Sequence, residues 1–163
     1  PSRGLGDVYK RQINTIAFMT IVFALLLYFA ERRNHENKNS FATLSFFTII
    51  FIGFMQTLAI MPGVSRSGIV ITAALLLNYS REDSIKIAFL LSIPAIFMAT
   101  VYQSMQLYEV GNIESLNEHL LGMILSFIFS YITIHLFIST INKISFTPYI
   151  VYRIALGLLL LTF

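Results

Sequence analysis

Long apolar runs constrain this chain more than any other feature. Residues 13–30 are mostly Ile, Phe, Leu, Val, Met and Ala, and similar runs cover about 41–61 and 119–141. A helix needs about 20 predominantly apolar residues to cross the roughly 30 Å hydrocarbon core of a bilayer. Because these runs reach that length, the sequence predicts an all-α integral membrane protein with several spanning helices.

The composition supports the same fold class. Hydrophobic residues make up 56% of the 163-residue chain and charged residues 12%, with a mean hydropathy of +0.76, whereas about 25% of an ordinary soluble domain is charged. The absence of Cys excludes disulfides and thiolate metal sites. Lys and Arg are dispersed in short segments rather than clustered in a stripe, so we expect membrane lipid, and no nucleic acid, as a partner.

The chain divides into a polar beginning and one membrane domain. Residues 1–12 are polar and basic and lack the apolar core of a signal peptide, so we predict a non-native or disordered tail. The membrane domain is predicted to cover 13–163. Its predicted helices are at about 13–30, 41–61, 65–78, 84–102, 119–141 and 148–163.

The basic residues predict an orientation. Lys and Arg occur in 31–38, in 81–86 and at Lys143, whereas 103–118 contains three Glu and neither Lys nor Arg. By the positive-inside rule, the three basic segments are cytoplasmic and 103–118 is external. The run 65–78 has about 14 residues, or roughly 21 Å of helix. We therefore predict that 41–61 and 65–78 form a re-entrant helical hairpin whose apex lies at membrane depth.

The apex of this hairpin, MPGVSRSG at 61–68, has the chemistry of an anion site. A helix break, two glycines, two hydroxyls and Arg66 directly precede an apolar helix. The first N–H groups of a helix have no internal partner, and the helix dipole favours negative charge there. The Arg66 guanidinium suits phosphate oxygens geometrically, and an ionisable residue inside a membrane marks a functional candidate.

Arg66 and Ser65 are the candidate catalytic residues. The candidate substrate-binding residues are Gly63, Ser65, Arg66, Ser67, Gly68 and Gln56. Either serine can contact phosphate, cap the helix or act as a nucleophile, and the spacing does not separate these roles. Gln56 can face the cavity or hydrogen-bond across helices. Because no cluster of Asp, Glu and His lies near the apex in sequence, we expect no metal ligands in this chain.

Three further polar or aromatic positions have structural interpretations. His135 lies within an apolar run without a second His or a carboxylate one turn away, which favours a helix-packing histidine over a ligand. Arg153, about one turn into the last helix, is expected to snorkel to the cytoplasmic interface. Tyr149 is expected in an aromatic belt near a helix end.

The run from Gln56 to Gly68, QTLAIMPGVSRSG, resembles the second signature of the undecaprenyl-diphosphate phosphatase family, whose members confer bacitracin resistance. Similarity continues through LNYSR at 77–81, AFLLSIPA at 88–95, and ISFTPY at 144–149 with the Tyr-Arg pair at 152–153. Val70 stands where the family commonly has Thr, so one hydroxyl contact of the family site is missing here.

The resemblance implies an activity and a location. Family members hydrolyse undecaprenyl diphosphate to undecaprenyl phosphate and inorganic phosphate with the help of a divalent cation, Mg or Ca. This reaction recycles the lipid carrier for peptidoglycan synthesis. The implied location is the bacterial cytoplasmic membrane, in a multi-pass protein whose site faces the external, periplasmic side.

The resemblance also implies that the chain is a carboxy-terminal fragment. The family fold is an inverted repeat, each half being a re-entrant hairpin plus three spanning helices, and this chain would hold the last helix of the first half and all of the second. The family's earlier signature, a Glu-rich helix before a Ser-Thr-Gly-His turn, does not occur here. The metal ligands are then expected in the missing amino-terminal half, which would be a partner of this chain. An oligomer is compatible with the sequence.

Two other functions were weighed. A second class of membrane lipid phosphatase needs Ser-Arg, five residues and then His, but Thr72 occupies that position, which excludes it. An anionic-lipid transporter or flippase, by contrast, can use the same anion-binding hairpin without hydrolysis.

Overall fold

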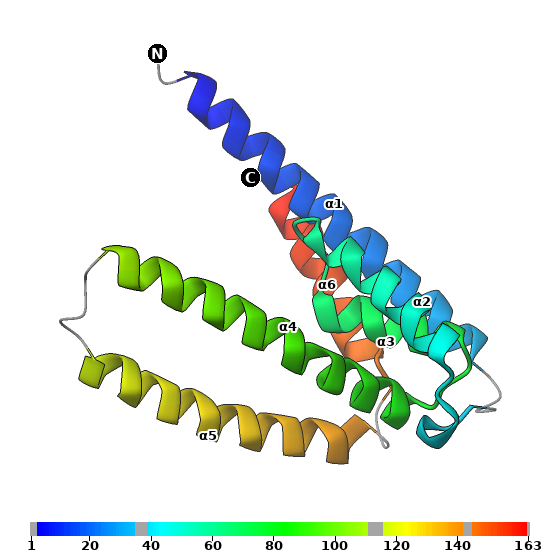
Figure 1. The fold of residues 1–163 in the computed structure, drawn as a ribbon. Helices are drawn as coiled ribbons and strands as arrows, with labels where there is room; N and C mark the ends of the chain where they lie inside the picture. The colour runs from blue at the N-terminus through cyan, green and yellow to red at the C-terminus, as the bar shows by residue number, and fades with distance from the viewer. Residues whose placement is uncertain (1–2, 35–38, 111–115, 142–144, 163) are drawn as a thin grey trace.

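The computed structural model describes residues 3–34, 39–110, 116–141 and 145–162, and within them the side chains of 3–11, 107–110, 116–119 and 141 are left out of the description. These ranges are helical and contain no β-strand (Figure 1). The elements in order are α1 Arg3–Arg33, η1 Phe41–Thr43, α2 Phe46–Thr57, η2 Leu58–Ile60, α3 Arg66–Leu76, α4 Arg81–Val110, α5 Leu116–Ile141 and α6 Thr147–Leu160.

Within the described ranges, three helical segments are long and apolar enough to cross a membrane. They are Gln12–Arg33, Arg81–Gln106 and Leu120–Thr140. The segments Phe46–Ile60, Arg66–Leu76 and Thr147–Leu160 are apolar but shorter. The predicted all-α class is therefore confirmed, and these three segments are candidate membrane spans.

The helix bounds differ from the predicted ones at several ends. Helix α1 begins at Arg3 and has no break before Ile13. The predicted boundary between the tail 1–12 and the membrane domain therefore does not coincide with a helix end. Helix α2 begins at Phe46, because Ser40 instead caps a short 3₁₀ turn at Phe41–Thr43. Helix α4 runs from Arg81 through Pro94 to Val110, so Pro94 does not end it. Whether 1–12 is native stays a prediction, and its first two residues lie outside the described part.

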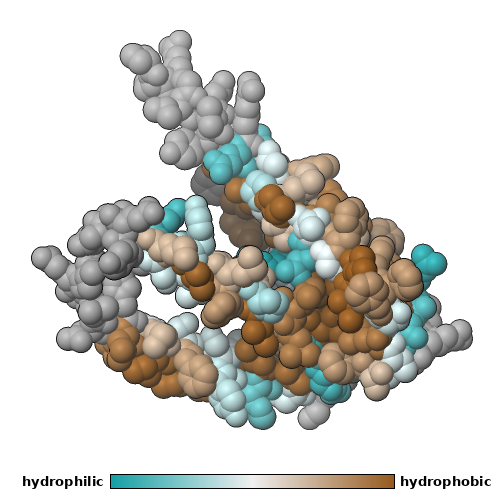
Figure 2. All heavy atoms as spheres, in the orientation of Figure 1, coloured by the Kyte–Doolittle hydropathy of each residue, from teal (hydrophilic) through white to brown (hydrophobic). Residues whose placement is uncertain are grey.

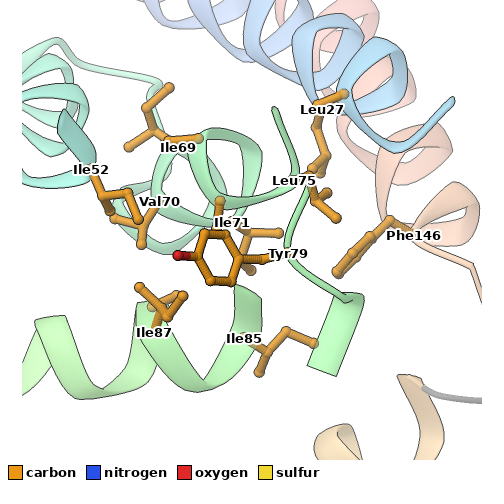
Figure 3. Close-up of a cluster of buried hydrophobic side chains, with 14 of the residues drawn as sticks. Leu27, Ile52, Ile69, Val70, Ile71, Leu75, Tyr79, Ile85, Ile87 and Phe146 are labelled. Carbon is orange, nitrogen blue, oxygen red and sulfur yellow. The ribbon is translucent and has the colours of Figure 1, made fainter. Parts of the chain in front are cut away.

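Helix α3 is the centre of the fold. Every residue from Gly68 to Leu75 is buried, although this helix is only 11 residues long. It packs against α1, α2 and α4, while α6 packs along α1. Figure 3 shows the resulting core, in which Ile69, Val70 and Leu75 of α3 meet side chains from the surrounding helices. This packing fixes the position of the turn that precedes α3.

The described parts of two segments predicted to be cytoplasmic, 31–34 and 81–86, lie at one end of the molecule, whereas 35–38 and Lys143 lie outside the described residues. The buried Glu31 carboxylate accepts hydrogen bonds from Arg81 Nε at 2.9 Å and from the Phe146 backbone N–H at 3.0 Å. Asn34 Nδ2 donates to the Tyr79 carbonyl at 2.6 Å. The end of α4 and the start of α5 lie far from this cluster (Figure 1). This arrangement agrees with the predicted topology, although which side is cytoplasmic stays a prediction.

Candidate anion-binding site

The predicted apex is a turn between η2 and α3 that rests on α1. Gly63 has a φ of +92°, and a Cβ placed there would lie 2.5 Å from the Ile16 carbonyl oxygen. The Gly63 carbonyl accepts a hydrogen bond from Thr20 Oγ1 at 3.3 Å. Both the backbone conformation and the close approach of α1 therefore require glycine at this position.

Ser65 is the N-cap of α3. Its Oγ accepts a hydrogen bond from the Gly68 N–H at 3.2 Å, and its carbonyl accepts one from the Ile69 N–H at 2.9 Å. Of the three roles predicted for this serine, capping is thus present. The backbone N–H groups of Arg66 and Ser67, which precede the internal helix bonds, have no partner within the described chain. They are available to an anion at the positive end of the helix dipole.

Arg66 and Ser67 are exposed at the same end of α3. The Arg66 guanidinium makes no hydrogen bond or ion pair with any described residue. Ser67 Oγ lies 3.4 Å from Ser65 Oγ. This end of α3 therefore brings together the Arg66 guanidinium, two hydroxyls and two backbone N–H groups, which is a donor set suited to phosphate oxygens.

Arg153 was predicted to snorkel to the interface, and this prediction is wrong. The residue is only 8% exposed, and its Nη2 donates to the Gly63 carbonyl at 2.6 Å. Helix α6 carries it there because Gly157, one turn further on, lets α6 approach α1 closely. The sequence did contain a signal, since Arg153 and Gly157 are spaced i and i+4 and so share one face of the helix.

Tyr149 also reaches the apex from α6. Its hydroxyl lies 3.4 Å from Ser65 Oγ, and its ring lies 5.8 Å from the Arg153 guanidinium carbon. The sequence placed this residue in an aromatic belt and did not link it to the site. Tyr149 and Arg153 are accordingly the two site residues that sequence reasoning missed.

An apolar cavity of about 90 Å³ opens beside the apex. Its lining includes Ser67, Gly68 and Tyr149 of the apex region, and the rest of its lining is Leu27, Ile71, Ile85, Ala88, Phe89, Phe137 and Phe146. The face of the molecule shown in Figure 2 has broad hydrophobic areas interspersed with hydrophilic residues. An anion at the apex would therefore have hydrocarbon as its neighbour, as the head group of a lipid does.

Two predicted polar contacts are not found. The Gln56 side-chain oxygen is buried without a hydrogen-bond partner, so in the described structure this oxygen does not bond across helices. His135 lies on the exposed face of α5, so its predicted role in helix packing is not met by the described helices.

The residues at the apex do not fit a divalent metal ion. Mg²⁺ and Ca²⁺ prefer carboxylate oxygens, whereas the apex offers hydroxyls and two guanidinium groups. The carboxylates whose side chains are described, Glu31, Glu82 and Asp83, lie at the basic end instead. No group of three or more His, Asp or Glu residues close enough to hold a metal is present among the described residues.

Comparison with known proteins identifies the family of this chain. A family model described as bacitracin resistance protein BacA matches residues 4–159. The chain belongs to this family. The BacA relatives include an undecaprenyl-diphosphatase of Saccharophagus degradans, 45% identical over 93% of this chain and 56% of the relative.

Two further undecaprenyl-diphosphatases show the same pattern of coverage. The protein of Vesicomyosocius okutanii is 43% identical over 92% of this chain and 57% of its own length. That of Pelagibacter ubique is 42% identical over 98% of this chain and 61% of its own length. The chain thus spans somewhat more than half the length of these BacA relatives.

Proposed function

We propose that this BacA-family chain is part of a longer membrane enzyme that hydrolyses undecaprenyl diphosphate to undecaprenyl phosphate and inorganic phosphate. Such an enzyme would recycle the lipid carrier for peptidoglycan synthesis and confer bacitracin resistance. The observation that carries the proposal is the apex, where Arg66, with no partner among the described residues, lies beside the open N-terminus of α3 and an apolar cavity. The relatives named undecaprenyl-diphosphatase support the same substrate class.

Each apex residue has a role in this reaction. Hydrolysis breaks the bridging P–O bond of the diphosphate and forms a bond between the terminal phosphorus and an oxygen that comes from water, which gives up a proton. Negative charge therefore develops on the phosphate oxygens. Arg66 and the first N–H groups of α3 stabilise that charge, and they do so more strongly in a water-poor cavity than in bulk water. Ser65 and Ser67 bind the phosphate oxygens as donors. A nucleophilic role for Ser65 stays a prediction, because no described carboxylate or histidine contacts its hydroxyl.

The remaining catalytic groups are proposed to lie outside this chain. The family resemblance predicts a divalent cation, Mg or Ca, and the apex residues do not fit one. We therefore assign its ligands, together with the general base, to the part of the BacA relatives that this chain does not cover. The missing amino-terminal half is thus proposed as the partner that completes the site.

We also propose that α2 and α3 form a re-entrant hairpin. They contain 12 and 11 residues, or roughly 18 and 17 Å of helix, which is short of the roughly 30 Å core. The apex touches α1 at Ile16 and Thr20. These residues precede Glu31, at the basic end, by roughly 17–22 Å along the helix. A turn at mid-membrane depth supports a hairpin that enters and leaves on the same side, and half of an inverted repeat remains our proposal for the fold.

The orientation is proposed from the basic end. Asn34 and the other residues of that end are cytoplasmic, the site faces the external side, and the membrane is the bacterial cytoplasmic membrane. Because the chain has no Cys, single-cysteine variants can be labelled without background. A membrane-impermeant maleimide added to intact cells should label Gln106→Cys but not Asn34→Cys. External labelling at Asn34 would reverse the orientation.

An assay in detergent micelles distinguishes hydrolysis from lipid transport. Micelles have no closed membrane, so transport across one cannot occur in them. The full-length protein should release inorganic phosphate from undecaprenyl diphosphate in micelles at a rate well above that of protein-free micelles. Absence of release, with binding of the lipid retained, would favour the anionic-lipid flippase over the phosphatase.

A further inference from the structure

Arg153 is a buried cation that has no counterion among the described residues. It is 8% exposed, and within the described residues no carboxylate lies within ion-pair distance of its guanidinium. Its contacts are the Gly63 carbonyl and, more distantly, the Tyr149 ring. Burying an unpaired charge costs several kcal/mol in order of magnitude, so its position calls for a compensating role.

The surroundings of Arg153 make this position more costly still. Its Nη1 lies 3.4 Å from where a Cβ of Gly68 would be, so the guanidinium rests against the first turn of α3. That end of the helix carries the positive pole of its dipole, where a cation is unfavourable and an anion is favourable. A bound anion would compensate both the buried charge of Arg153 and the positive pole of the α3 dipole.

Arg153 also holds the turn that presents the other donors. Its Nη2 and Thr20 Oγ1 both donate to the Gly63 carbonyl, at 2.6 and 3.3 Å. The position of this carbonyl fixes the left-handed turn immediately before Ser65 and Arg66. The contact of α6 with α1 at Gly157 anchors the arginine in turn.

We propose that Arg153 is a positioning residue of the anion site: it fixes the Gly63 carbonyl beneath the apex and adds its buried charge to the field at the N-terminus of α3. The inference rests on the proposed function, because it assumes that an anion binds at the apex. A field made by two arginines and a helix dipole favours the more highly charged head group. The site should therefore prefer a diphosphate to a monophosphate.

The test is equilibrium binding of inorganic pyrophosphate and of inorganic phosphate to the detergent-solubilised chain, by calorimetry. Arg153→Gln should lower pyrophosphate affinity by roughly ten- to hundredfold, the scale of one charged hydrogen bond, and phosphate affinity by less. Arg153→Lys keeps the charge and should retain the preference for pyrophosphate with reduced affinity. Arg33→Gln, which removes an exposed positive charge from the far end of α1, is the matched control and should bind as wild type does.

A purely structural role makes a different prediction. It would lower the affinity for both anions by the same factor in Arg153→Gln, in step with loss of thermal stability, and this result would overturn the proposal. If Arg153→Gln does not fold, loss of the pyrophosphate preference in folded Arg153→Lys would overturn it equally. Wild-type pyrophosphate affinity in Arg153→Gln, with phosphate release by the full-length protein intact, would refute the role of Arg153 and leave the phosphatase proposal standing.

Discussion

The helices around the apex and the helices farthest from it differ in almost every physical respect. Around the apex, α3 is buried from Gly68 to Leu75, and Arg153 bonds across to a different element. In α5, none of the span Leu120–Thr140 is buried. The far hydroxyls bond within their own helices, as Thr100 does to the Ile96 carbonyl and Ser139 to the Leu136 carbonyl. One region is thus built to hold polar groups at depth, and the other to meet a hydrocarbon solvent.

Small residues account for much of this difference. Ala17, Ala24 and Ala30 are completely buried along α1, and Gly157 of α6 packs against the Ala17 carbonyl and the Ile21 side chain. Helices in membranes associate through such close packing, because the hydrophobic effect does not drive them together in lipid. On α5, the glycine Gly122 has nothing within 4 Å of where its Cβ would be. Glycine therefore permits close helix packing beside the apex, whereas on α5 it makes no such contact with a described residue.

The largest expected effect in this comparison is that of Gly63→Ala. The methyl group would meet the Ile16 carbonyl at 2.5 Å on a backbone with φ of +92°. We expect a loss of about 2–6 kcal/mol in the free energy of unfolding. The thermal unfolding midpoint in detergent should fall by roughly 5–20 °C.

The matched control is Gly122→Ala on the exposed helix. It should leave the unfolding midpoint unchanged or raise it slightly, because Ala favours a helix over Gly by about 1 kcal/mol and meets no neighbour there. Equal losses of stability in the two variants would break the contrast between the regions. A wild-type midpoint in Gly63→Ala would show that the apex does not pack on α1 as described.

The sequence predicted the features that depend on local pattern. The spanning helices follow from apolar runs of sufficient length, and the turn before α3 follows from Pro62-Gly63 and the capping residue Ser65. These are properties of neighbouring residues. The turn and the open N-terminus of α3 were accordingly predictable without any knowledge of packing, while binding of an anion there stays a proposal.

The sequence did not predict which helices surround the apex. Arg153 is 90 residues from Gly63, and its direction depends on how α6 is rotated against α1, which is a property of tertiary packing. Val70 illustrates the same limit: it stands where the family commonly has Thr, and in the structure it is buried in the core near Ile52 (Figure 3). Periodicity identified the helices but not the rotation of each helix toward its neighbours.

The apex is proposed to stabilise charge on a diphosphate, and substitution of Arg66 tests this role most directly. The measurement is the maximal rate of phosphate release from undecaprenyl diphosphate by the full-length protein at matched membrane abundance. Arg66→Ala should lower this rate by about two to three orders of magnitude, the scale seen when a preorganised electrostatic donor is removed. Arg66→Lys should restore it in part, since it keeps the charge but loses the bidentate fork. Arg33→Gln, as the charge-matched control, should have the wild-type rate. Wild-type maximal rates in both Arg66 variants would contradict the account and remove Arg66 from the site.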